Sequence, residues 1–286
     1  MNNQTASLPT NPPIVLITGT SSGFGLLTAI ALGKAGYHVI ATMRDLSKQN
    51  RLIERATAEN IIQNIECMQL DVTDEKSINQ TIKTILAKYQ RIDVLVNNAG
   101  YAVGGCVEDI PLEVWREQFE TNFFGLITLT QAVLPIMRQQ KQGKIINISS
   151  ISGRLGFPGY AAYSASKFAV EGFSESLRHE MLPFGVYVVI VEPGSYKTEI
   201  WDKGFANMQT SPESAYRTQL EAVLRYSHKA AKTSPDPQLI ADLIVRITAK
   251  ASPKLRYPLG KGARLSIWGK ALLPLKWFEW MLHKLL

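Results

Sequence analysis

The fold is decided by residues 14–25, which read Ile14-Val-Leu-Ile-Thr18-Gly19-Thr-Ser-Ser-Gly23-Phe-Gly25. The run Ile14–Thr18 has the β-branched, apolar composition of a buried strand, and three glycines lead from it into the helical stretch 24–36. Glycines let the backbone turn tightly and approach a pyrophosphate, whose charge then lies at the helix N-terminus. The alternative is a Gly-rich strand-to-helix turn with no ligand, so this segment alone indicates a nucleotide site only weakly.

The same alternation of strand and helix continues along the chain. Short apolar runs without polar alternation are typical of parallel strands covered on both faces, and amphipathic stretches of helical length separate them. We therefore expect a single doubly wound, Rossmann-type α/β sheet of about seven strands with right-handed crossovers. The expected strands are Ile14–Thr18, His38–Met43, Ile65–Leu70, Asp93–Asn97, Lys144–Ser149, Val186–Val191 and Lys254–Pro258, and the expected helices include 24–36, 75–89, 112–138 and 160–182.

Composition divides the chain into three parts. Residues 1–13 are polar with three prolines and are expected to form a flexible arm. Residues 14–258 form the Rossmann-fold domain, in which the polar stretch 195–237 is expected to be a substrate loop or lid. Residues 259–286 form a basic, Trp-rich amphipathic tail.

The net charge of +7 comes entirely from the end of the chain. From Lys250 onwards eight basic residues accompany a single acid, Glu279, so the first 249 residues are neutral overall. A protein that uses its whole surface to bind nucleic acid would distribute its basic residues differently, so we expect no nucleic-acid partner.

Several other classes of protein are disfavoured by residue content. The two cysteines, Cys67 and Cys106, are too few for a disulfide framework, and the four dispersed histidines predict no metal site. No signal peptide is recognisable, and no stretch reaches the roughly 18 uninterrupted apolar residues of a spanning helix. We expect a cytoplasmic protein that at most touches a membrane surface.

Tyr163 and Lys167 have the spacing of an acid/base pair. Their i, i+4 separation places the phenol and the ammonium on one helix face. A free tyrosine has a pKa of about 10, so action near neutrality needs a fall of about 3 units, and a lysine charge about 4 Å away supplies roughly that much. Ser150 follows the fifth expected strand, whose carboxyl end should face the ligand crevice. A lone Tyr-x-x-x-Lys is, however, more often a surface pair.

Taken together, the segments resemble the short-chain dehydrogenases/reductases, most closely the branch with steroid and retinol dehydrogenases. The resemblance spans about residues 14–258 and rests on Thr18–Gly25, Asn97–Gly100, Asn122, Ser150, Tyr163-x-x-x-Lys167 and Pro193-Gly194. It implies a nicotinamide-dependent oxidoreductase that interconverts a primary or secondary alcohol with its aldehyde or ketone, working as a homodimer or homotetramer.

The resemblance also implies roles for single residues. Tyr163 is the general acid or base, and Lys167 lowers its pKa and holds the nicotinamide ribose. Ser150 polarises the substrate oxygen, and Asn122 holds a water in the proton relay. Asp71 meets the adenine. The implied cofactor contacts are Gly19, Ser21, Ser22, Gly23, Phe24, Gly25, Asp71, Val72, Asn98, Ala99, Gly100, Tyr163, Lys167, Pro193, Gly194 and Thr198.

Arg44 indicates which nicotinamide cofactor is used. An NAD enzyme of this fold carries a carboxylate at the end of the second strand, where this chain has Met43 and then Arg44. An arginine there pairs with the 2′-phosphate of NADP, and Ser22 adds a hydrogen bond. This predicts NADP(H), the alternative being that Arg44 merely pairs with Asp45.

The stretch after Pro193-Gly194 is rich in aromatic side chains. They suggest a pocket for a lipophilic substrate, or equally a lid fastened to the core. The residues concerned are Tyr196, Trp201, Phe205, Met208, Tyr216 and Tyr226.

The tail is expected to form a helix that begins at Pro274. Lys276, Glu279 and His283 would form one polar stripe, while most other residues are large and apolar. Such a helix could dock in a groove beside the substrate lid, pack in an oligomer, or lie on a membrane through residues 261–286. A rival hypothesis for the whole protein is therefore an NADP-binding sensor or scaffold that its tail recruits to a membrane or partner. The intact set of Ser150, Tyr163 and Lys167 argues against it.

Overall fold

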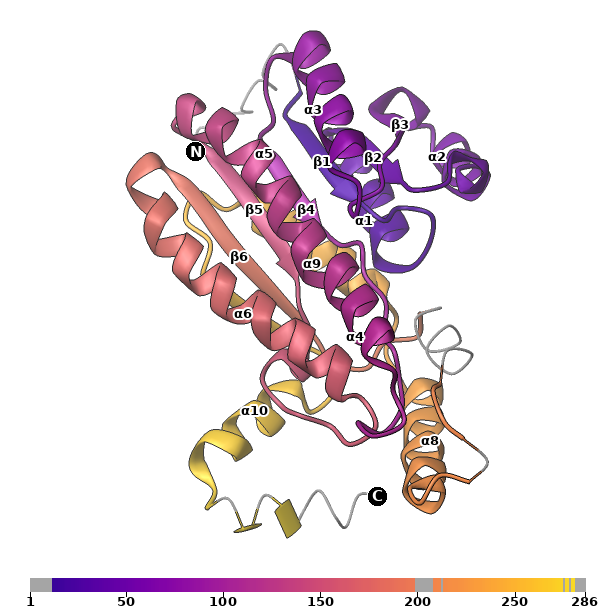
Figure 1. Cartoon of the computed structure of the whole chain (residues 1–286). Helices are drawn as coiled ribbons and strands as arrows, with labels where there is room; N and C mark the ends of the chain where they lie inside the picture. Colours follow the sequence, from indigo (N-terminus) through magenta and orange to yellow (C-terminus); the bar gives the residue numbers. More distant parts are fainter. Residues whose placement is uncertain (1–11, 199–207, 212, 275, 278, 281–286) are drawn as a thin grey trace, which may run out of the picture.

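A seven-stranded parallel sheet forms the centre of the protein (Figure 1). The computed structural model describes residues 12–198, 208–211, 213–274, 276, 277, 279 and 280. The strand order is β3-β2-β1-β4-β5-β6-β7, so the connection reverses direction between β1 and β4, which is where open α/β sheets form their ligand crevice. The strands are β1 (Ile14–Thr18), β2 (His38–Met43), β3 (Ile65–Gln69), β4 (Val94–Asn97), β5 (Gly143–Ile148), β6 (Val186–Pro193) and β7 (Arg256–Leu259).

Helices cover both faces of this sheet. The helices are α1 (Gly23–Lys34), α2 (Asn50–Ala58), α3 (Glu75–Tyr89), α4 (Leu112–Phe119), α5 (Gly125–Gln140), α6 (Ala161–Met181), α8 (Arg217–Lys232), α9 (Gln238–Ala249) and α10 (Ala263–Leu272). Because successive strand residues point to opposite faces, Val15 of β1 packs with α1, α2 and α9, whereas Leu16 packs with α3, α5 and α6. The doubly wound sheet with about seven strands that the sequence predicts is thus confirmed.

The expected continuous helix over 112–138 is wrong in detail. A π-helical turn over Glu120–Phe124 separates α4 from α5. Its centre is Asn122, a buried residue whose side chain binds the main chain of Tyr101. Single π-helical turns inside helices occur frequently at functional sites.

The tail also differs from its expected form. The helix α10 begins at Ala263 after a left-handed turn at Gly262 and ends before Pro274, so it precedes the expected helix. Beyond it, Lys276, Trp277, Glu279 and Trp280 are helical, and the Trp277 amide donates to the Pro274 carbonyl at 2.9 Å. His283 lies outside the described residues. In the part of the chain that the structure describes, no helix is long and apolar enough to cross a bilayer.

Candidate active site

The turn between β1 and α1 requires its glycines. Gly19 and Gly23 have φ angles of +69° and +56°, in the left-handed region that favours glycine. A Cβ atom on Gly25 would lie 2.2 Å from the Gly19 carbonyl oxygen, so α1 approaches the turn too closely for any side chain there. Ser22 caps α1 without a side-chain hydrogen bond. The turn therefore presents the first amides of a helix to the crevice, as a pyrophosphate requires.

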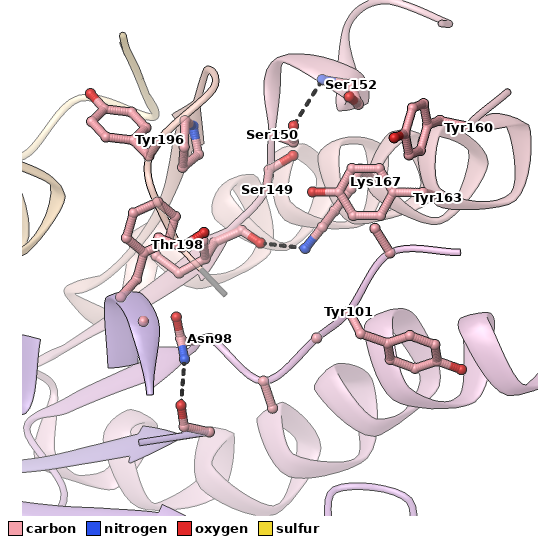
Figure 2. Close-up of a pocket in the computed structure, with 18 of the residues that line it drawn as sticks. Asn98, Tyr101, Ser149, Ser150, Ser152, Tyr160, Tyr163, Lys167, Tyr196 and Thr198 are labelled. Carbon is pink, nitrogen blue, oxygen red and sulfur yellow. Dashed lines mark hydrogen bonds between the residues drawn. The ribbon is translucent and has the colours of Figure 1, made fainter. Parts of the chain in front are cut away.

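The ends of β1 and β4 are tied together beside this turn. The Thr18 hydroxyl accepts hydrogen bonds of 3.0 Å from the backbone amides of Asn98 and Ala99. The Asn98 side chain donates in return to the carbonyls of Thr18 (2.8 Å) and Gly19 (3.0 Å), and Figure 2 draws the Asn98 side chain with one of its hydrogen bonds. Two motifs that lie eighty residues apart in the sequence thus form one wall.

Ser150, Tyr163 and Lys167 meet where β5 ends. The Lys167 ammonium donates a 2.8 Å hydrogen bond to the Ile148 carbonyl, and its nitrogen lies 5.8 Å from the centroid of the Tyr163 ring. Figure 2 shows the Tyr163 and Lys167 side chains side by side on α6, facing the segment that carries Ser150. Ser150 itself is buried, and its hydroxyl accepts from the Ser152 amide at 3.0 Å. The geometry brings together three of the four residues that the sequence predicted to be catalytic, Asn122 being the fourth.

Burial controls the protonation of this pair. It lowers the pKa of Lys167 to about 8, partly offset by the negative charge of Glu171. It also raises the pKa of Tyr163, although a hydrogen bond with Ser150 acts in the opposite direction. In this structure the pKa of Tyr163 is raised and not lowered as expected, because the loss of hydration outweighs the hydrogen bond with Ser150.

Asn122 connects the segment after β4 to α6 through side-chain hydrogen bonds. Its side-chain amide donates to the Tyr101 carbonyl (2.9 Å) and to the Ser166 hydroxyl (3.1 Å), and its oxygen accepts from the Tyr101 amide (3.0 Å). These bonds hold the segment after β4 against α6. The side chain is not among those that line the cavity, so a role in a water relay stays a prediction.

A cavity of about 470 Å³ opens at the carboxyl ends of the strands. Most residues predicted to bind the cofactor or substrate line it: Gly19, Ser21, Ser22, Gly23, Phe24, Arg44, Val72, Asn98, Ala99, Gly100, Ser150, Tyr163, Lys167, Pro193, Gly194 and Thr198. Gly25 lies behind the turn. The Asp71 carboxylate accepts from the amide and hydroxyl of Thr73, and it is the flanking Leu70 and Val72 that reach the cavity.

Arg44 lies at the cavity wall, directly after β2. Its alternative partner, the carboxylate of Asp45, instead accepts from the amide and hydroxyl of Ser47 at 3.0 and 2.7 Å. Asp45 also pairs with Lys48 at 3.7 Å. Arg44 is thus exposed at the end of the cavity where the ribose of a dinucleotide bound to the glycine turn would lie.

The other end of the cavity is lined by aromatic and aliphatic side chains. Of the aromatic residues expected there, Tyr196 and Tyr226 line it. Met208 instead lies close to Gly104, and Tyr216 donates to Glu108 at 2.7 Å, so neither is among the lining residues. Trp201 and Phe205 lie outside the described residues.

Sequence reasoning missed several lining residues on this side. They are Tyr101, Ser149, Phe157, Pro158, Tyr160, Val223, Ser227 and Ala230. The last three lie on α8 at spacings of four and three residues, a helical pattern that was detectable in the stretch expected to be a lid.

A buried ionic cluster lies behind Lys167. Arg256 of β7 pairs with Glu171 at 3.0 Å and Glu192 at 3.5 Å, and Glu192 also binds Arg154 at 3.0 Å. Burial, together with the charge of Glu192, raises the pKa of Glu171 to about 7. The cluster joins β6, β7, α6 and the segment after Ser150.

Known proteins are similar to this chain over most of its length. The family described as short chain dehydrogenase matches residues 13–209. An uncharacterised oxidoreductase of Bacillus subtilis, YusZ, is 49% identical over 94% of this chain and 96% of its own. A 3-ketodihydrosphingosine reductase of Bacteroides thetaiotaomicron is 38% identical (87% and 88% covered), and human retinol dehydrogenase 8 is 39% identical (86% and 80%).

Solved structures agree with the fold. The crystal structure of a short-chain dehydrogenase from Streptomyces avermitilis superposes with a TM-score of 0.79 at 36% identity, covering 91% of this chain and 92% of the other. The structure of ElxO with NADP bound gives a TM-score of 0.74 at 29% identity, covering 89% and 99%.

Proposed function

Because the chain belongs to the short-chain dehydrogenase family, we propose that it is an NADP(H)-dependent oxidoreductase that interconverts a lipophilic alcohol with its ketone or aldehyde. The convergence of Ser150, Tyr163 and Lys167 on one cavity is the observation that carries this proposal. The relatives are named oxidoreductases, reductases or dehydrogenases, so an enzyme is favoured over a cofactor-binding sensor or scaffold.

The proposed reaction consists of a hydride transfer and a proton transfer. NADPH, when bound in the cavity, would supply the hydride for the carbonyl carbon. The Tyr163 hydroxyl donates the proton to the carbonyl oxygen, which becomes the alcohol, and the reverse transfers oxidise the alcohol. Ser150 donates a hydrogen bond to the same oxygen and stabilises the negative charge that develops on it. Lys167, held by the Ile148 carbonyl, stabilises the phenolate that remains on Tyr163.

The glycine turn and Arg44 support NADP(H) as the cofactor. A Cβ at Gly25 would occupy the space needed for tight packing of α1. The N-terminus of α1, where the Ser22 side chain makes no capping hydrogen bond, suits a pyrophosphate. The exposed Arg44 guanidinium at the cavity wall suits a 2′-phosphate, which it can bind through two parallel hydrogen bonds.

A lipophilic substrate is supported by the cavity wall. Phe157, Val223 and Tyr226 offer it an apolar surface in the cavity that Tyr163 also lines. The named substrates of two relatives, 3-ketodihydrosphingosine and retinol, are long-chain or isoprenoid compounds of this chemical class.

We also propose a cytoplasmic protein that assembles as a homodimer or homotetramer. Leu112 and Phe124 are exposed on the helical layer formed by α4 and the π-helical turn, which supports packing between copies there. Cys67 and Cys106 are free thiols, as a reducing compartment allows. Sedimentation velocity of the purified protein tests the assembly, and a monomer at micromolar concentration would contradict it.

A turnover screen tests the proposed activity. NADPH oxidation is measured with a set of hydrophobic ketones and aldehydes, for the wild type and Tyr163→Phe. We expect turnover by the wild type and a loss of about 100-fold or more in the variant, the usual contribution of a general acid. Equal activity in both proteins would disprove the role of Tyr163.

A further inference from the structure

Three large apolar side chains of α10 point away from the domain that the helix lies on. Leu265, Trp268 and Leu272 follow each other at i, i+3 and i+7 and so share one face. Their exposed fractions are 78%, 64% and 72%. A helix that lies on a domain in water normally turns such residues inward.

The inner face of α10 contacts the domain through Ala263 and Lys270. Ala263 is buried beside Gly194. The Lys270 ammonium donates a 2.7 Å hydrogen bond to the Arg154 carbonyl and lies 5.2 Å above the Phe168 ring. The orientation of the helix is thus fixed by specific contacts, and its apolar face points away from the protein.

The chain after α10 extends this exposed surface. Trp277 is helical and 68% exposed. We call Leu265, Trp268, Leu272 and Trp277 the outer apolar surface. Figure 1 shows that α10 lies beyond the carboxyl ends of the strands, at the same end of the molecule as α8.

The charges around the outer apolar surface favour one kind of occupant. Lys261, Arg264 and Lys276 are exposed on the same segment, whose single acid is Glu279. A second copy of this chain would bring the same positive charge against it, which is unfavourable. A bilayer with anionic lipids offers both an apolar layer and negative charge, and tryptophans with basic residues are the side chains that prefer that interface.

We propose that the outer apolar surface docks the protein on membranes that contain anionic lipids. The apolar face of α10 enters the boundary between headgroups and acyl chains, while Lys261, Arg264 and Lys276 bind the lipid phosphates. The helix lies in the plane of the membrane and does not cross it.

The docking site adjoins the substrate cavity. The amide of Gly194, which lines the cavity, donates to the Leu259 carbonyl at 2.8 Å, four residues before α10 begins. A lipophilic substrate dissolved in the bilayer would then reach the cavity without crossing water. This consequence, unlike the docking itself, rests on the proposed function.

Vesicle flotation of the full-length protein tests the docking. Wild type, Leu265→Ser/Trp268→Ser and Lys261→Glu/Arg264→Glu are mixed with vesicles of phosphatidylcholine, with or without phosphatidylglycerol. We expect the wild type to float with the anionic vesicles, and each variant to lose about tenfold or more in partition coefficient. Leu239→Ser on α9 and Lys83→Glu on α3, which alter exposed residues of other helices, should bind like the wild type.

The alternatives give different results. If neither the wild type nor the variants float, or if the variants float as well as the wild type, the proposal is wrong. It is also wrong if the wild type fails to float but self-associates in sedimentation velocity, with Leu265→Ser/Trp268→Ser monomeric. Thermal unfolding confirms that the variants are folded. Flotation requires no turnover, so an inactive protein that floats would contradict the proposed function and leave the docking intact.

Discussion

The Lys167 ammonium donates a 2.8 Å hydrogen bond to the carbonyl of Ile148, the last residue of β5. Ser150 follows Ile148 by two residues, so this hydrogen bond fixes the Lys167 ammonium relative to the Ser150 hydroxyl. The same burial that positions Lys167 lowers its pKa to about 8, because a charge removed from water is costly. Burial of the charged Lys167 side chain therefore destabilises the folded protein.

Lys167→Met should make the protein more stable below pH 8 than the wild type is. A lysine with a lowered folded-state pKa binds more protons when unfolded, between about pH 8 and 10.5. The wild type therefore gains stability as the pH rises through that window. The difference in the free energy of unfolding between Lys167→Met and the wild type should narrow by about 3 kcal/mol between about pH 8 and 10.5. Urea unfolding at a series of pH values measures this, with Lys83→Met on the surface of α3 as control. A difference that does not change with pH would show that Lys167 is not destabilised by burial.

Arg44→Ala should change the choice of cofactor. Loss of a charge-assisted pair with the 2′-phosphate costs about 2 kcal/mol, so kcat/KM for NADPH should fall by about 30-fold while that for NADH stays within about twofold. Steady-state kinetics with both cofactors measure the ratio, with Arg116→Ala on α4 as control. An unchanged NADPH/NADH ratio would remove the basis for assigning NADP.

Gly25→Ala should damage the cofactor site through packing alone. The new methyl would meet the Gly19 carbonyl oxygen at 2.2 Å and the Asn98 amide at 2.5 Å, so the turn must shift. We expect a loss of about 1–3 kcal/mol in stability and at least about tenfold weaker NADPH binding. Gly172→Ala on α6, where the new methyl meets nothing within 4 Å beyond its chain neighbours and the backbone of its own helix, is the control. Titration of NADPH fluorescence checks the binding, and equal affinities for Gly25→Ala and the wild type would contradict the packing argument.

Arg256→Leu should destabilise the protein by about 3 kcal/mol, because it leaves the buried carboxylate of Glu171 without its cation. The pKa of Glu171 is already raised to about 7, so the folded state binds more protons than the unfolded state between about pH 4.5 and 7. The loss should therefore be smaller at pH 5 than at pH 8, where the carboxylate must be charged. Adding Glu171→Gln should restore part of the stability at pH 8. A loss that is the same at both pH values would show that the charge of Glu171 is not its cause.

The parts of the structure that the sequence predicts well are those that local chemistry determines. The turn from Thr18 to Gly25 and the pair Tyr163/Lys167 are encoded by glycines and by helical spacing, and both are found where they were expected. The observed ends of the strands differ from the expected ends by at most two residues. Apolar β-branched runs indicate where a strand lies but not at which residue its hydrogen bonding ends.

What the sequence does not predict depends on contacts distant in the chain. The direction of the Tyr163 pKa follows from burial by the whole domain, which no spacing reveals. The π-helical turn follows from the fit of Asn122 to Tyr101. The start of α10 was missed even though Gly262 before it and Pro274 after it are signals for the ends of a helix.

Transfer of deuterium from NADPH labelled at the reactive carbon of its nicotinamide to a hydrophobic ketone tests the central claim most directly. In a single turnover the wild type should place one deuterium on the carbinol carbon of the product, detected by mass spectrometry. With NADPH at a saturating concentration, Tyr163→Phe should form product about 100-fold more slowly or worse. If the wild type binds both NADPH and the ketone and transfers no deuterium, or if Tyr163→Phe transfers it at the wild-type rate, the account of this site is wrong.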